Sequence, residues 1–172
     1  MASLMENLID ILDRESVEYE GLLEISQRKT PIIVSGNLED LQKITDEEQN
    51  VVNRLNVLER KRIEVTADIA TVLNKDVTKL TLTNLISLLK GRPGEQGALA
   101  SLHDRLQRTV HELQRVNEQN GSLLRDALEM VEFEINMLQA SRLAPETANY
   151  TKTAGASGDV LGTSQGKFDA KQ

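Results

Sequence analysis

A heptad pattern in the middle of the chain constrains its fold most strongly. Ten positions between 41 and 72 recur at alternating spacings of three and four residues, and eight of them are apolar. They are Leu41, Ile44, Glu48, Val51, Leu55, Leu58, Arg62, Val65, Ile69 and Val72. A repeat of about 3.5 residues places all ten on one side of one helix, which we call the heptad seam. Because an uncovered seam would leave a long apolar strip in water, the chain is predicted to pack against helices, its own or a partner's.

Apolar spacing and capping residues along the rest of the chain predict an all-α protein. We expect an elongated antiparallel bundle of long helices, coiled-coil-like, with one short helix. The expected helices span about residues 2–34, 38–74, 82–90 and 96–141. They form one helical domain, 1–141. The remainder, 142–172, is predicted to be a disordered, flexible tail, because 15 of its 31 residues are Gly, Ala, Ser or Thr and bury too little surface to fold.

Two features near the end of the first helix mark its boundary. Pro31 removes one backbone hydrogen bond, so we expect either a kink near Gln27 or a short break there. Gly36 suits a left-handed cap at the end of the first helix. Asn37, with Asp40 three residues later, suits the N-cap of the second helix.

Polar residues on the helix seams are expected to find partners within the bundle. Glu15 and Glu48 are predicted to lie at the seam edge or to pair with a base such as Arg62 or Lys29. The last helix has its own seam, and it contains two asparagines. Its members are Leu99, Leu102, Leu106, Val110, Leu113, Asn117, Asn120, Leu124, Ala127, Val131, Ile135 and Leu138. Buried asparagines of this kind cost stability but set the register of packed helices.

The end of the last helix carries a second apolar stripe outside its seam. We call its members, Met130, Phe133, Met137 and Ala140, the Met/Phe stripe. At about 100° per residue, this stripe lies roughly 150° around the axis from the seam. One interpretation is that the end of the first helix, residues 32–34, covers it. The other is that it forms a binding groove, since flexible Met side chains suit adaptable binding.

Composition argues against several classes of function. The net charge of −7 argues against nucleic acid and anionic membrane surfaces, which need a basic footprint. The chain has no Cys, and its two histidines, His103 and His111, are too far apart on a helix to share a metal. No catalytic motif occurs, so we expect no enzyme activity and no cofactor. No run approaches 18 apolar residues and no signal pattern begins the chain, so we expect a cytoplasmic protein without membrane insertion.

Several short motifs, in this order, resemble the FlgN family of flagellar export chaperones. They are Glu15, Tyr19, Leu22 and Leu23; then Gly36, Asn37, Leu38, Glu39 and Leu41; then Glu48, Leu55, Leu58, Glu59 and Arg62; and, in the tail, Asn149, Tyr150, Gly155 and the closing Phe168, Asp169, Ala170 and Lys171. The resemblance implies a cytoplasmic, non-enzymatic chaperone that uses no nucleotide. It implies binding to the C-terminal segments of hook-filament junction (hook-associated) proteins, which prevents their premature assembly, and their delivery to the flagellar type III export machinery. It also implies that the C-terminal helix region binds these clients.

These inferences give two hypotheses that the seam distinguishes. In the first, the chain is an export chaperone that binds a client helix along Met130, Phe133, Met137 and Ala140, with Tyr150 clamping from the tail. In the second, it is a structural coiled-coil protein whose heptad seam makes a homodimer. A chaperone should bury the seam within one chain and leave the region near residues 130–140 open. A scaffold should need a second copy to cover the seam.

Overall fold

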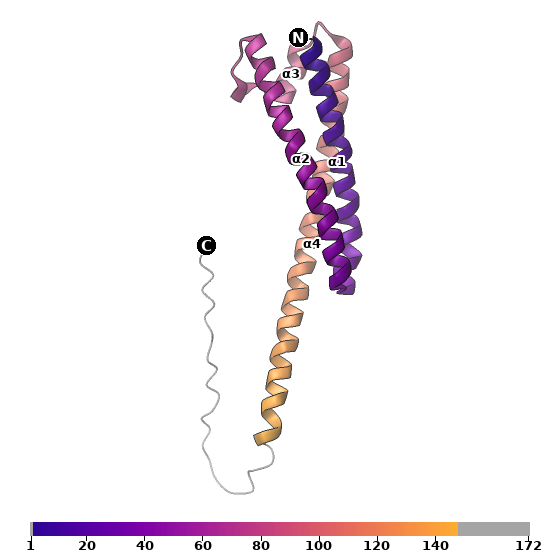
Figure 1. Ribbon diagram of the computed structural model, residues 1–172, viewed down its shortest axis with the longest axis vertical. Helices are drawn as coiled ribbons and strands as arrows, with labels where there is room; N and C mark the ends of the chain where they lie inside the picture. The colour runs from indigo at the N-terminus through magenta and orange to yellow at the C-terminus, as the bar shows by residue number, and fades with distance from the viewer. Residues whose placement is uncertain (1, 148–172) are drawn as a thin grey trace. The chain divides into compact units, whose positions relative to one another are not determined.

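The computed structural model describes residues 2–147, and the secondary structure in this range is helical. In chain order its elements are α1 (Ala2–Ser35), α2 (Leu38–Leu73), the 3₁₀ turn η1 (Val77–Lys79), α3 (Leu82–Leu88) and α4 (Pro93–Thr147), as Figure 1 shows. The predicted all-α fold, with one short helix and a long last helix, is therefore confirmed. The first compact unit ends at Met130 and the second begins at Val131. Of the predicted tail, residues 148–172 lie outside the described range.

The bounds of the last two helices differ from the prediction. α4 begins at Pro93 rather than near residue 96, because proline is favoured at the first helical position, where its missing N–H costs no hydrogen bond. The glycines that follow Pro93 therefore belong to the first turns of α4 and not to a loop. The short helix ends at Leu88 rather than at residue 90. At its far end, α4 continues beyond residue 141 to Thr147.

The turn between α1 and α2 has the predicted geometry. Gly36 adopts a positive φ of 69°, a conformation that costs glycine little. Its N–H reaches back to the carbonyl of Ile32 at 3.2 Å. Asn37 then accepts a hydrogen bond through Oδ1 from the backbone N–H of Asp40 at 3.1 Å. The left-handed cap and the N-cap are both confirmed.

Helix α1 continues without a break through Pro31 to Ser35, so of the two predicted alternatives, a kink near Gln27 or a short break, the break is wrong. Proline removes one backbone donor, but packing after Pro31 offsets this loss. Ile33 is buried, and Ile32 packs against the hydrophobic core. Tertiary contacts on both sides of Pro31 thus hold the last turn of α1 in helical conformation.

Side-chain contacts give the relative directions of the helices in the first unit. Arg28 of α1 pairs with Glu47 of α2, whereas Glu15 pairs with Arg62, so the two helices are antiparallel. α4 runs parallel to α1, because Arg105 contacts Asp13 and the later Asn117 contacts the later Ser26. In the first unit the three long helices therefore alternate in direction, and α1, α2 and the first part of α4 lie side by side (Figure 1).

The core of the first unit consists of two apolar clusters. The first joins all four helices and the segment before α3; it comprises Met5, Leu8, Ile11, Leu12, Val65, Ile69, Ala70, Leu80, Leu85, Leu89, Leu99 and Leu102. The second joins the three long helices; it comprises Leu22, Ile25, Ile44, Val51, Leu55 and Leu113. The short helix α3 contributes to the first cluster and so covers one end of the bundle.

The heptad seam supplies much of this core from α2. Buried seam residues occur along its whole length, from Ile44 to Ile69. Val72 is the exception: the prediction that it belongs to the seam is wrong, since its side chain is exposed. Near the end of α2 the buried side shifts to Ala70, with Leu73 packed against the first cluster. A helix with 3.6 residues per turn drifts away from a 3.5-residue repeat in this way.

Ion pairs occupy the two charged seam positions, as predicted. Arg62 Nε lies 3.1 Å from Glu15 Oε1, and Lys29 Nζ lies 3.1 Å from Glu48 Oε2. The Glu15 side chain is almost fully buried. Burial raises the pKa of the Glu15 carboxyl, and the nearby Arg62 guanidinium opposes this rise only in part.

The raised pKa of Glu15 predicts that Glu15→Gln stabilises the protein at pH 7. The folded-state pKa lies above the unfolded-state value, so ionised Glu15 destabilises the fold at neutral pH. This cost disappears as the pH falls through the folded-state pKa towards the ordinary value of about 4.3. Thermal unfolding should show a higher Tm for Glu15→Gln than for the wild type at pH 7, and a shrinking difference at lower pH. A lower Tm of the variant at pH 7 would mean that the ion pair with Arg62 outweighs the burial cost.

Both seam asparagines of α4 find partners on α1, as their predicted role in setting register requires. Ser26 Oγ donates to Asn117 Oδ1 at 3.0 Å. Thr30 Oγ1 donates to Asn120 Oδ1 at 2.6 Å, and Asn120 Nδ2 donates to the Ser26 carbonyl at 2.8 Å. Asn120 is buried, whereas Asn117 is exposed. This network fixes one alignment of α4 against α1.

We expect Asn120→Ala to lower the free energy of unfolding by about 1–3 kcal/mol, because it removes two hydrogen bonds between α4 and α1 at a buried position. Asn117→Ala should cost less, since Asn117 is exposed and the substitution removes one hydrogen bond where Asn120→Ala removes two. Denaturant titration of both variants measures the difference. Equal losses of unfolding free energy would show that the burial of Asn120 adds nothing to its contribution to stability.

Candidate protein-binding surface

The end of α4 exposes apolar side chains that the sequence assigns to the seam. Val131, Ile135 and Leu138 were expected to be buried, but their side chains are 51%, 49% and 63% exposed, so this part of the prediction is wrong. The register explains why. Thr30 contacts Asn120, and α1 ends at Ser35, so α1 can accompany α4 only to about residue 125 at the helical rise of 1.5 Å per residue.

The Met/Phe stripe is exposed as well. The side chains of Met130, Phe133 and Met137 are 65%, 64% and 56% exposed, and Ala140 is also exposed. Within the first unit, Ile33 at the end of α1 is buried, while Val34 is exposed. Isolated surface apolar residues are ordinary, but a contiguous group of this kind marks a site of interaction.

One exposed apolar residue was missed by the sequence analysis. Leu128 is 68% exposed and lies one turn before Val131 and two turns before Ile135 on the same helix. Leu128 lies three residues before Val131 and seven before Ile135, and this helical spacing could have identified it as part of the same apolar face. With Leu128, apolar side chains cover most of the circumference of α4 between residues 128 and 140. The remaining predicted site residue, Tyr150, lies outside the described residues.

These apolar residues cannot perform acid–base or nucleophilic chemistry, but they can bury surface against another protein. Apolar surface contributes about 25 cal/mol per Å² when it is removed from water. Phe and Met offer large area, and the three rotatable bonds of Met let one surface fit several partners. The arrangement is therefore suited to binding an apolar or amphipathic protein segment.

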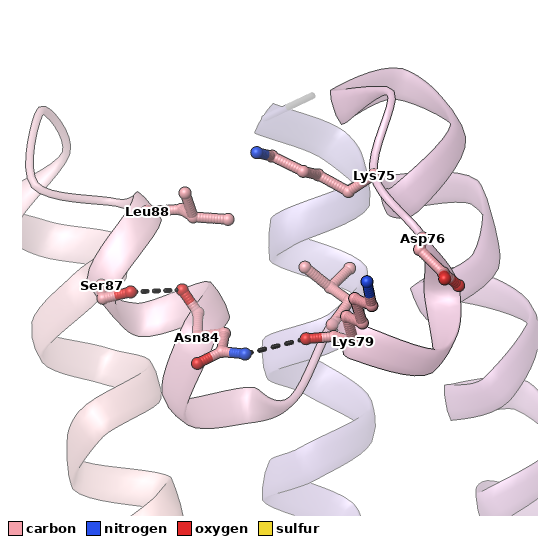
Figure 2. Close-up of a pocket in the computed structure, with 7 residues that line it drawn as sticks. Lys75, Asp76, Lys79, Asn84, Ser87 and Leu88 are labelled. Carbon is pink, nitrogen blue, oxygen red and sulfur yellow. Dashed lines mark hydrogen bonds between the residues drawn. The ribbon is translucent and has the colours of Figure 1, made fainter.

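A second candidate site lies at the other end of the first unit, between η1 and α3 (Figure 2). It is a hollow of about 330 Å³. Its lining residues are Lys75, Asp76, Lys79, Leu80, Asn84, Ser87 and Leu88. Asn84 Nδ2 donates to the Lys79 carbonyl at 2.8 Å, and Asp76 Oδ1 accepts from the backbone N–H of Thr78 at 2.9 Å. These polar side chains hold the local backbone, so they account for the shape of this connection without a ligand.

Two further findings concern membranes and metals. Within residues 2–147, no helix combines the length and the apolar composition that crossing a bilayer requires. The same part of the chain contains no group of three or more His, Cys, Asp or Glu side chains placed to hold a metal ion.

The described part of the chain is an all-α protein with exposed apolar side chains at the end of α4, and comparison with known proteins gives its family. Residues 1–158 match the FlgN family, whose description reads "FlgN protein". This chain belongs to the FlgN family. This is a family of flagellar export chaperones rather than of enzymes, so the chain is a chaperone of flagellar biogenesis. Members of the family bind flagellar hook-associated proteins in general.

One curated relative is similar over nearly the whole length of both proteins. It is YvyG of Bacillus subtilis strain 168, described as an uncharacterised protein. The two sequences are 27% identical over 165 residues, which cover 95% of this chain and 96% of the relative. No solved structure matches the chain.

Proposed function

We propose that this protein is a cytoplasmic chaperone that binds the C-terminal segments of hook-associated proteins along the end of α4. The bound client would contact Met130, Phe133, Met137 and Ala140, with Tyr150 closing on it from the C-terminal part of the chain. Binding would keep the client from assembling prematurely and present it to the flagellar type III export machinery. The chaperone would act by association alone, without catalysis.

The observation that carries this proposal is the exposure of the Met/Phe stripe in a member of a chaperone family. Junction subunits must remain unassembled until export, and covering an assembly segment with a complementary apolar surface achieves this without covalent chemistry. An amphipathic helix that docks on such a surface is a common mode of peptide recognition. Met and Phe are the residue types that such a surface uses for adaptable, high-area contacts.

The burial of the heptad seam favours the chaperone over the homodimeric scaffold. Ile44, Val51 and Leu55 pack within the second cluster of the same chain, together with Leu22 and Leu113. The helices of its own chain therefore already cover most of the apolar seam side chains that a second copy would have to bury.

Affinity capture from flagellated cells tests the proposed function. The tagged chain should retain hook-associated proteins, and it should fail to retain the same proteins after removal of their C-terminal segments. The truncated clients serve as the matched control, because they preserve every other surface of the client. If the chain instead captured only further copies of itself, and light scattering gave a dimer, the scaffold would be the correct interpretation.

A further inference from the structure

The charged side chains at the exposed end of α4 are all acidic. Between positions 126 and 141 the chain has four carboxylates and no basic side chain. They are Asp126, Glu129, Glu132 and Glu134, and all four are exposed. The ion pairs found among residues 2–147 use other carboxylates. None of the four carboxylates forms an ion pair in the described part of the chain, and the nearest basic residues along α4, Arg125 and Arg142, lie just outside the two ends of this stretch.

Three of these four carboxylates border the Met/Phe stripe. Residues three or four apart are neighbours on a helix surface. Asp126 therefore lies one turn before Met130, and Glu129 lies one turn before Phe133. Glu134 lies beside Met130 on the opposite edge of the stripe.

Glu132 differs from the other three carboxylates in its position. At about 100° per residue it lies roughly 80–160° around the axis from the members of the stripe, and no stripe residue lies three or four positions from it. The chain thus contains carboxylates at the stripe and a chemically identical one away from it, which permits a matched comparison.

We propose that the client segment bound on the Met/Phe stripe is an amphipathic helix whose apolar face is bordered by Lys and Arg. This inference rests on the proposed function and specifies the chemistry of the partner. Basic side chains beside the apolar face would meet Asp126, Glu129 and Glu134 across the interface. Such complementarity raises the association rate and selects among apolar helices that would otherwise bind equally well.

The same charges disfavour a second copy of this chain as the occupant. Two copies of the stripe placed face to face would bring carboxylates close to carboxylates, and like charges across an interface oppose binding. The apolar surface alone would fit either a client or a second copy. The acidic border is the feature that favours the basic client.

Charge reversal on the two edges of the stripe tests this proposal. The variant is Glu129→Lys with Glu134→Lys, and the matched control is Glu118→Lys with Glu132→Lys, which changes the net charge equally at exposed positions away from the stripe. The probe is the synthetic C-terminal segment of a hook-associated protein, titrated calorimetrically at low salt. We expect about tenfold weaker binding for the stripe variant and about twofold or less for the control. The loss should shrink in about 1 M NaCl, where screening acts within about 3 Å.

The outcomes separate this inference from the proposed function. Unchanged or tighter binding by the stripe variant, or equal losses in both variants, would overturn the acidic border as a determinant of partner choice. If Met130→Ala with Phe133→Ala still weakened binding, the proposed function would stand without it. If the wild type bound no C-terminal segment of any hook-associated protein, the proposed function itself would fail, and this inference with it. Circular dichroism should show equal helicity in all variants, because every substituted carboxylate is exposed.

Discussion

Leu55→Asp should unfold the helical bundle of this protein. Leu55 is 7% exposed and lies in the second apolar cluster beside Leu22 and Leu113. An unpaired carboxylate placed there costs several kcal/mol, which rivals the whole stability of a domain, about 5–15 kcal/mol. The helical circular dichroism signal and its cooperative thermal transition should both be lost at pH 7.

A neighbouring substitution controls for the added charge in this experiment. Asn56→Asp introduces the same carboxylate one residue later, at an exposed position of α2. It should leave the Tm nearly unchanged, since surface substitutions cost about 0.5 kcal/mol or less. If Leu55→Asp retained the helicity and Tm of the wild type, the assignment of the heptad seam to the core would be incorrect.

Met130→Ala together with Phe133→Ala should weaken client binding strongly while leaving the fold intact. Both side chains are mostly exposed, so their truncation opens no cavity in the core. Buried aromatic and Met anchors dominate interfaces of this kind, and losing two should cost about 2–4 kcal/mol, or about 30-fold to 1,000-fold in Kd. Calorimetric titration with a hook-associated C-terminal segment measures the loss.

The matched control for this double variant removes apolar area from another exposed surface. Val17→Ala with Val57→Ala truncates two exposed side chains of α1 and α2, at 54% and 46% exposure. This control should bind the client as the wild type does. Unchanged affinity of the Met130 and Phe133 double variant would place the client site elsewhere on the molecule. A large drop in its Tm would mean that these side chains are covered within the protein in solution.

Local sequence patterns predicted much of the first unit correctly. The heptad seam of α2 and the turn at Gly36 and Asn37 depend on spacing and on short-range chemistry, which a single sequence displays. The N-cap of α3 is a short-range feature of the same kind, since Thr81 Oγ1 accepts from the backbone N–H of Asn84 at 3.2 Å. Such features form in the same way in most tertiary surroundings.

Features that depend on where a partner helix ends were predicted poorly. The periodicity of α4 continues through Val131, Ile135 and Leu138, but periodicity states only which side chains share a face. Whether that face is buried depends on the length and register of the helix opposite it, and in the first unit α1 follows α4 only to about residue 125. The two apolar faces of the candidate site could therefore be found from sequence, while the exposure of both could not. The same limit explains Val72, where a strict heptad was extended beyond the buried part of α2.

Hydrogen exchange with and without client tests the central claim, that the client binds along the end of α4, most directly. The wild-type chain is incubated with the C-terminal segment of a hook-associated protein, and amide exchange is followed by mass spectrometry. Because a docked helix would oppose local opening, exchange should slow in peptides spanning residues 126–141. Peptides of α1 and α2 that line the buried clusters should keep their exchange rates. The claim would be contradicted if saturating client slowed exchange only in peptides before residue 126 and left exchange in residues 126–141 unchanged.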